Sequence, residues 1–264
     1  MDLGIKGRRA IVTGGSSGIG FETARQFLEE GARVLITGRN QQKLEKARDD
    51  LAKRTGGEVH AAVADMTKES DITKMVEIAK QKFGGVDILV NNAGQMYSGR
   101  FASIKDDELK TQLETKLFGF MRAIRAVYPM MKAQKWGRIV NTIGGAGKEP
   151  DPYMFGSAMT NSALLNLTKS LSEEFGEDNV LVNAICPGWV ATDLWVRNTE
   201  GMKKEFGVAS EAEARKIAAK KNSLGRMGKP EELANATVFL CSERASYITG
   251  VAVNLDGGRL KGLW

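Results

Sequence analysis

Short runs with the character of buried strands alternate with segments of helical periodicity along almost the whole chain of 264 residues. This alternation is typical of a parallel sheet covered by helices on both faces. The sequence therefore predicts a single-domain α/β fold with a doubly wound parallel sheet of seven strands. The predicted strands are 10–13, 34–37, 59–64, 86–90, 138–142, 180–185 and 251–255, and the predicted helices are 19–30, 41–53, 71–83, 106–134, 154–175 and 230–240.

Residues 194–225 interrupt the alternation with a charged stretch between a strand and a helix. Ser210 is followed three residues later by Glu213, a capping-box pattern that predicts the start of a short helix. An inserted helix beyond the carboxyl ends of the strands can serve as a substrate lid or can be a solvated surface helix, and the composition fits both interpretations.

The charge of the chain does not indicate a nucleic-acid partner. The 38 Lys and Arg residues exceed the 32 Asp and Glu residues by six, but they are scattered and do not form a run interleaved with aromatic residues. No apolar run approaches the roughly 20 residues of a spanning helix, and no basic segment followed by an apolar one stands at the beginning. We expect a cytoplasmic protein that binds neither nucleic acid nor membrane.

The cysteines and the histidine offer little chemistry. Cys186 and Cys241 occur in a chain with ample apolar residues for a core, so they are predicted to be small buried side chains rather than a disulfide. His60, the single histidine, has no partner motif. Neither a metal site nor a Ser/His/Asp arrangement is predicted.

A glycine-rich loop follows the first predicted strand and opens the first helix: Thr13-Gly14-Gly15-Ser16-Ser17-Gly18-Ile19-Gly20. The loop would present free backbone N–H groups and the positive end of a helix dipole to an anion. Gly14 and Gly18 permit a tight turn and close approach of a ligand, while Gly20 permits close packing of the helix on the strand. The loop therefore predicts a pyrophosphate site.

With this loop the sequence resembles the short-chain dehydrogenase/reductase family, whose Thr-Gly-x-x-x-Gly-x-Gly pattern it reproduces. The resemblance spans nearly the whole chain and implies a Rossmann-type fold. It rests further on residues that follow the third, fourth, sixth and last predicted strands. These are Asp65, Asn91-Asn92-Ala93-Gly94, Pro187-Gly188, Thr192 and Asp256-Gly257-Gly258.

The resemblance implies a nicotinamide cofactor. Asp65 and Met66 would flank the adenine, Asn92, Ala93 and Gly94 would line the cofactor cleft, and Thr192 would contact the nicotinamide amide. The second strand ends at Gly38 and Arg39, where a carboxylate would select NAD(H) and an arginine accepts a 2′-phosphate. NADP(H) is therefore predicted in preference to NAD(H), although Ser17 supplies no second positive charge. The predicted cofactor-binding residues are Gly14, Ser16, Ser17, Gly18, Ile19, Gly20, Arg39, Asp65, Met66, Asn92, Ala93, Gly94 and Thr192.

The resemblance also locates the family's four catalytic positions, and all four carry other residues. The Asn, Ser, Tyr and Lys of the family correspond to Lys116, Gly144, Ser157 and Asn161. A serine hydroxyl titrates far above a phenol and reaches less far, so Ser157 cannot act as the usual acid or base. Lys and Asn have in effect exchanged places.

The candidate catalytic residues are Lys116, Tyr153, Ser157 and Asn161, and Tyr97 is a further hydroxyl near the substrate side. Lys116 replaces the missing positive charge if its side chain converges with Asn161, and it is inert if it points to solvent. Tyr153, one turn before Ser157, and Tyr97 donate a proton if a nearby ammonium lowers their pKa, or are packing residues.

Three functions fit these residues. The first is an oxidoreductase without the usual tetrad, acting on a small carbonyl, alcohol or conjugated carbonyl. The second is a non-redox isomerase, cyclase or lyase that uses the bound dinucleotide. The third is a cofactor-binding pseudoenzyme, or a partner subunit of a related active chain. The resemblance implies a homo-oligomer, a tetramer or dimer, assembled through residues 106–134 and 154–175, with which Leu164, Leu165 and Leu167 are compatible.

Overall fold

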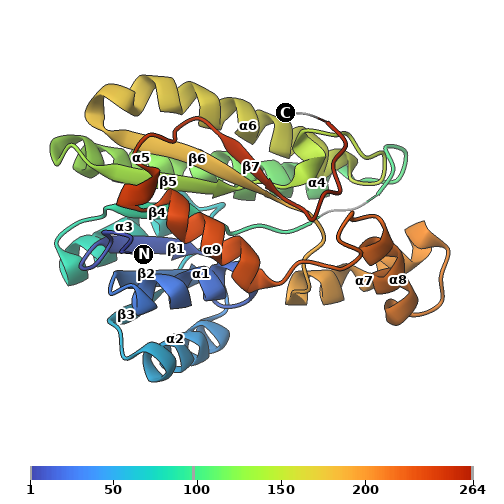
Figure 1. Cartoon of the computed structure of the whole chain (residues 1–264), viewed down its shortest axis with the longest axis horizontal. Helices are drawn as coiled ribbons and strands as arrows, with labels where there is room; N and C mark the ends of the chain where they lie inside the picture. Colours follow the sequence, from blue (N-terminus) through green and yellow to red (C-terminus); the bar gives the residue numbers. More distant parts are fainter. Residues whose placement is uncertain (1, 97–98, 263–264) are drawn as a thin grey trace.

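The computed structural model of the protein describes residues 2–96 and 99–262. In this part of the chain, parallel strands form one sheet in the order β3-β2-β1-β4-β5-β6-β7 (Figure 1). The predicted doubly wound fold is thereby confirmed. The strands are β1 (Arg9–Thr13), β2 (Arg33–Gly38), β3 (Val59–Val63), β4 (Ile88–Asn91), β5 (Gly137–Thr142), β6 (Val180–Pro187) and β7 (Ala252–Leu255).

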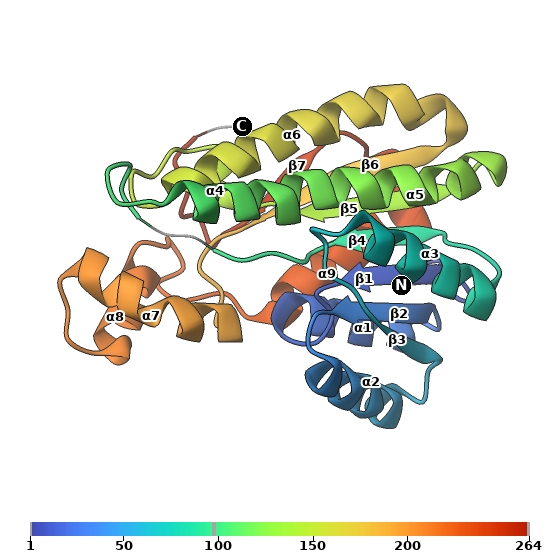
Figure 2. The ribbon, with the colours of Figure 1, turned by 180° about the vertical axis from the view of Figure 1, so that it is seen from behind.

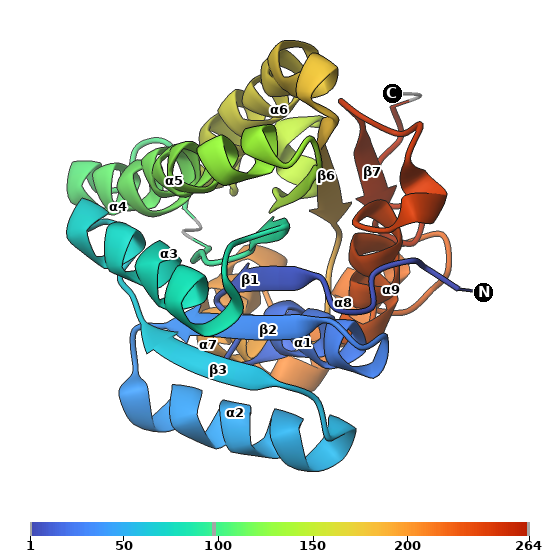
Figure 3. The ribbon, with the colours of Figure 1, turned by 90° about the vertical axis from the view of Figure 1, so that its left-hand side faces the viewer.

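Helices cover both faces of the sheet, as the end-on view in Figure 3 shows. Alternate residues of β1 explain the two layers: Ala10 and Val12 enter one buried cluster, and Ile11 enters the other. The first cluster packs against α1 (Gly18–Glu29), α2 (Gln41–Thr55) and α9 (Pro230–Leu240), and the second against α3 (Glu69–Phe83), α5 (Gly119–Ala133) and α6 (Phe155–Phe175).

The long helix predicted over 106–134 is three consecutive pieces. α4 (Asp106–Gln112) passes into a π-helical turn, Leu113–Phe118, before α5 begins. Apolar periodicity does not reveal such a turn, because one extra residue within a turn shifts the pattern only slightly. The π-helical turn carries Lys116.

The charged stretch after β6 contains two helices, α7 (Asp193–Phe206) and α8 (Glu211–Lys220). They lie beyond the end of the sheet where β6 ends (Figures 1 and 2). The predicted capping box starts α8, since Ser210 Oγ accepts from Glu213 N at 3.2 Å. α7 was not predicted, because its many charged residues mask a narrow buried stripe that includes Trp195 and Met202.

Burial corrects one expectation and confirms another. Leu164 is fully enclosed between α6 and the sheet, so it cannot contribute to a contact between subunits. Cys186 and Cys241 are both buried and unpaired, as predicted. Among the described residues, no helix combines the length and the hydrophobicity needed to cross a bilayer.

Candidate active site

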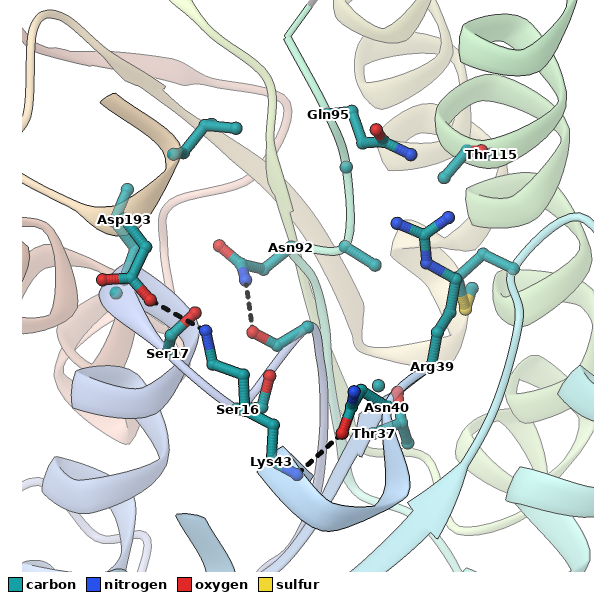
Figure 4. Close-up of a pocket in the computed structure, with 18 of the residues that line it drawn as sticks. Ser16, Ser17, Thr37, Arg39, Asn40, Lys43, Asn92, Gln95, Thr115 and Asp193 are labelled. Carbon is teal, nitrogen blue, oxygen red and sulfur yellow. Dashed lines mark hydrogen bonds and ion pairs between the residues drawn. The ribbon is translucent and has the colours of Figure 1, made fainter. Parts of the chain in front are cut away.

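The loops that follow β1, β2, β3, β4 and β6 meet at the carboxyl edge of the sheet, where open α/β sheets bind ligands. They enclose a cavity of about 440 Å³ (Figure 4). Except for Gly20, every predicted cofactor-binding residue lines it: Gly14, Ser16, Ser17, Gly18, Ile19, Arg39, Asp65, Met66, Asn92, Ala93, Gly94 and Thr192.

Hydrogen bonds from the segment after β4 hold the glycine-rich loop. Thr13 Oγ1 accepts from the backbone N–H groups of Asn92 (2.9 Å) and Ala93 (3.0 Å), and Asn92 Nδ2 donates to Thr13 O at 3.1 Å. α1 begins at Gly18 without a side-chain cap from Ser17. Its first N–H groups therefore remain available to an anion.

Gly20 does not line the cavity, but it packs against the glycine-rich loop. A Cβ at this position would lie 2.5 Å from both Asn92 Nδ2 and Gly14 O. The glycine thus allows α1 to pack closely against the loop and the Asn92 amide, which is the packing role that the sequence predicted for it.

Basic side chains gather at the end of β2. The Arg39 guanidinium extends across the cavity toward Gln95 (Figure 4), whose amide oxygen accepts from Nη2 at 3.1 Å when it faces the arginine. Burial disfavours ionisation of Asp65, but hydrogen bonds from Thr67 and the nearby charge of Arg39 lower its pKa overall. Lys43, in the first turn of α2, also lines this cavity and pairs with Asp193 at 2.8 Å.

Beside the predicted Arg39, Lys43 is a second cation in the cofactor cavity, and it was not predicted from the sequence. Its signal was present, because it stands four residues after Arg39 in the first turn of a helix that begins at the cleft. The dinucleotide fingerprint does not include this position.

A second cavity, of about 200 Å³, adjoins the first, and we call it the inner cavity. The two cavities share Ile19, Asn92, Gly94, Gln95, Thr192 and Leu194. Lys116, Gly144, Ser157 and Asn161 all line it. The four positions matched to the family's catalytic residues therefore lie around one cavity, next to the cleft for the cofactor.

Lys116 points into the protein and meets Asn161. Its Nζ donates to Ile143 O and, at 2.8 Å, to Asn161 Oδ1. Among the described residues it has no third acceptor, so one N–H remains for a ligand. Because protein atoms surround the ammonium, desolvation lowers the pKa of Lys116 to about 8.

The hydroxyl candidates are placed differently. Ser157 Oγ accepts from Nε2 of Gln112, a buried residue of α4, at 3.0 Å. Tyr153 does not line the inner cavity: its hydroxyl donates to Gly201 O in α7 at 2.6 Å. In this arrangement Tyr153 packs against the inserted helices and is not a proton donor to the cavity. Tyr97 lies outside the described residues.

One wall of the inner cavity is mainly apolar. It includes Met96, Met154, Trp189 and Trp195, with the two indoles edge to face at 5.4 Å between ring centroids. Trp195 belongs to α7, so the inserted segment contributes directly to the cavity. Arg259 stacks on Trp189 at 4.8 Å. Within the described part of the chain, no group of three or more His, Cys, Asp and Glu side chains is placed to hold a metal ion.

Comparison with known proteins agrees with this geometry. The model of a family described as enoyl-(acyl carrier protein) reductase matches residues 14–259. The chain belongs to the short-chain dehydrogenase/reductase family. It is 35% identical to a 3-oxoacyl-[acyl-carrier-protein] reductase of Chlamydia muridarum, over 95% of this chain and 96% of that protein. It is 34% identical to a 3alpha-hydroxysteroid dehydrogenase of Mediterraneibacter gnavus, over 97% and 98% of the two chains.

A solved structure is similar along the full length of the chain. L-sorbose reductase of Gluconobacter frateurii, complexed with NADPH and L-sorbose, superposes with a TM-score of 0.93 at 34% identity and covers all of both chains. These relatives act on an acyl-carrier-protein substrate, a steroid and a sugar. Membership in the short-chain dehydrogenase/reductase family therefore establishes the fold and the class of cofactor chemistry, while the substrate depends on the inner cavity.

Replacing Gly20 with alanine tests the packing of the loop. We expect Gly20→Ala to lower the free energy of unfolding by about 1–3 kcal/mol, the usual cost of overpacking, and to weaken dinucleotide binding. Gly176→Ala is the matched control, because a Cβ there meets nothing within 4 Å. Urea unfolding and fluorescence titration measure both effects, and equal behaviour of the two variants would contradict the assigned role.

The buried ammonium predicts a pH dependence of stability. Because the folded-state pKa of Lys116, about 8, lies below the ordinary 10.5, the unfolded chain binds more protons between these pH values. The stability of the wild type should therefore rise, relative to Lys116→Met, as the pH increases from about 8 to about 10.5, by at most about 3 kcal/mol. The free energy of unfolding is measured by urea unfolding at each pH. A difference between the two proteins that stays constant from about pH 8 to about 10.5 would show that the lysine is not desolvated.

Proposed function

We propose that the protein is an NADP(H)-dependent reductase of small carbonyl or conjugated carbonyl compounds, in which Lys116 replaces the usual acid. The residues around the larger cavity fit a dinucleotide. Uncapped N–H groups of α1 suit the pyrophosphate, and a Cβ at Gly18 would lie 3.3 Å from Thr192 Cγ2, so the glycine keeps the passage between them open. When bound, the cofactor supplies the hydride.

Charge at the end of β2 supports a preference for NADP(H). Gly38 stands where a carboxylate would accept from the ribose 2′-OH, and Arg39 and Lys43 present two cations to the same cavity. The similar sorbose reductase structure was solved with NADPH. Arg39 and Lys43 are the residues that would hold a 2′-phosphate.

Lys116 supplies both a charge and a proton in this proposal. Its ammonium faces the cavity with one unused N–H, and a pKa of about 8 keeps it largely protonated at neutral pH while making proton release easier than from an ordinary lysine. In such a reduction the substrate's carbonyl oxygen would gain negative charge, and Lys116 Nζ would give it the proton. Solvent then reprotonates the amine.

The inner cavity limits the substrate. About 150 Å³ is enough to hold benzene, so a cavity of about 200 Å³ accommodates a group about the size of one six-membered ring. No Asp or Glu side chain lines it among the described residues, while Lys116 and Arg259 do. The cavity thus favours a compact neutral or anionic substrate. In a conjugated carbonyl, hydride adds to the β-carbon and leaves an enolate, which needs a weaker acid than an alkoxide does.

The observation that carries this proposal is the contact of Lys116 Nζ with Asn161 Oδ1 in a cavity that adjoins the cofactor cleft. This contact supports the proposal that the exchange of Lys and Asn keeps an ammonium where the substrate's oxygen would lie. A site that had lost all chemistry would not require a desolvated lysine there.

Cofactor choice is tested at Arg39. Loss of a charged hydrogen bond to phosphate costs about 1.5–3 kcal/mol, so Arg39→Ala should weaken NADPH binding about 10- to 100-fold and change NADH binding less than about threefold. Arg48→Ala, at a partly exposed residue of α2 (Gln41–Thr55) that does not line the cofactor cavity, is the control. Fluorescence titration with each cofactor decides, and equal losses for NADPH and NADH would contradict a 2′-phosphate contact.

Catalysis is tested at Lys116 with a panel of small ketones, aldehydes and cyclic enones, by following NADPH consumption. The wild type should turn over at least one class. Lys116→Met should lower kcat about 10²–10⁴-fold and leave the Kd for NADPH within about twofold, because it removes proton transfer and not cofactor binding. Lys110→Met, on an exposed face of α4, should match the wild type.

The pH profile separates a proton donor from a purely structural lysine. For reduction, wild-type kcat should be constant below about pH 8 and fall about tenfold per unit above it, since the protonated form is the active one. The residual rate of Lys116→Met should not show this fall. Full activity of Lys116→Met would refute the proposal, and NADPH binding without turnover of any panel member would favour the non-redox or partner-subunit functions.

A further inference from the structure

The turn after β5 lets α6 approach the inner cavity unusually closely. Its sequence is Gly144-Gly145-Ala146-Gly147, and Gly145–Gly147 forms a short 3-10 helix. A Cβ at Gly147 would lie 2.7 Å from Asn161 Cβ, and a Cβ at Gly144, where φ is +122°, would lie 2.9 Å from Asn161 Nδ2. The amide of Asn161 therefore occupies the space that a side chain at residue 144 would need.

The contact with Lys116 fixes which way this amide faces. Asn161 Oδ1 accepts from Lys116 Nζ at 2.8 Å, so Nδ2 is directed to the other side, toward Gly144. Asn161 is only 4% exposed and lines the inner cavity. Among the described residues, Nδ2 has no hydrogen-bond acceptor, although an amide nitrogen carries two donor hydrogens.

We propose that Asn161 Nδ2 is a catalytic donor that binds the substrate's carbonyl oxygen, and that Gly144 is the positioning residue that makes room for it. This inference rests on the proposed reductase function. Lys116 and Asn161 then form a two-donor cradle, one charged and one neutral, for the oxygen that gains negative charge. Donors already fixed in place by protein contacts stabilise such charge most effectively.

This two-donor cradle differs from the pattern of the family, in which a serine stands at the position of Gly144. A serine hydroxyl and the Asn161 amide cannot occupy the same space, because even the Cβ of residue 144 approaches Nδ2 to 2.9 Å. Restoring the family's serine with Gly144→Ser should therefore displace the amide and slow the enzyme rather than improve it.

Two variants of the cradle test the assignment by kinetics. Asn161→Asp keeps an oxygen facing Lys116 but replaces the N–H donors with a second oxygen. It should lower kcat about 10²–10³-fold, the loss typical of one oxyanion donor, and move the pH above which kcat falls upward, because a carboxylate raises the pKa of the ammonium. Gly144→Ser should lower kcat with little change in the Kd for NADPH.

Gly84→Ala is the matched control, since this glycine also has a left-handed φ of +82° but a Cβ there meets nothing within 4 Å. It should leave kcat unchanged, which separates backbone strain from displacement of the amide. An Asn161→Asp enzyme within about threefold of wild-type kcat, or a Gly144→Ser enzyme faster than wild type, would overturn the inference.

A measurement without turnover keeps this test independent of the proposed function. In ¹⁵N-labelled protein saturated with NADP⁺, the side-chain NH₂ resonances of Asn161, identified by their absence in Asn161→Asp, should shift as acetate presents a carboxylate oxygen to the cradle. Resonances that do not move with saturating acetate would overturn the donor role. If the wild type reduces no carbonyl but these resonances shift, the reductase function fails while the oxygen-binding cradle stands.

Discussion

Removing a lysine ammonium from water costs free energy unless other polar atoms replace its hydration shell, and Lys116 has no carboxylate partner among the described residues. Its replacements are two neutral oxygens, Ile143 O and Asn161 Oδ1. Neutral acceptors satisfy the N–H groups without compensating the charge, so the pKa is held low. Because no carboxylate compensates its charge, the ammonium strongly attracts any oxygen that becomes negative in the same cavity.

Three distant segments must meet for this contact to exist. The π-helical turn between α4 and α5 presents Lys116, the end of β5 leads to Ile143 and the glycine turn, and α6 supplies Asn161. A parallel sheet gathers such segments at its carboxyl edge, and the same edge forms the cofactor cleft between the loops of β1 and β4. Fold and chemistry are thus linked through a single edge of the sheet. The inserted helices α7 and α8 close the other side of the cavity with Trp195.

Sequence patterns predicted the strands, most helices and the cofactor loop, because these depend on local periodicity and on backbone requirements such as that of Gly20. They also placed Lys116, Gly144, Ser157 and Asn161 together through the family resemblance. What they could not predict depends on contacts between distant segments. Neither the direction of the Lys116 side chain nor the Tyr153 bond to Gly201 leaves a local signal. α7 was not predicted because its buried stripe is narrow. The close approach of the Asn161 amide to Gly144 joins α6 to the turn after β5, and a contact between such distant segments has no sequence signal.

The titration of the Lys116 ammonium tests the central claim most directly. In protein with ¹³C-labelled lysine, the Cε resonance that disappears in Lys116→Met can be followed as a function of pH. Desolvation by the surrounding protein predicts a midpoint near pH 8. A midpoint near 10.5, the value of an ordinary solvated lysine, would contradict both a buried ammonium and its role as the acid of this site.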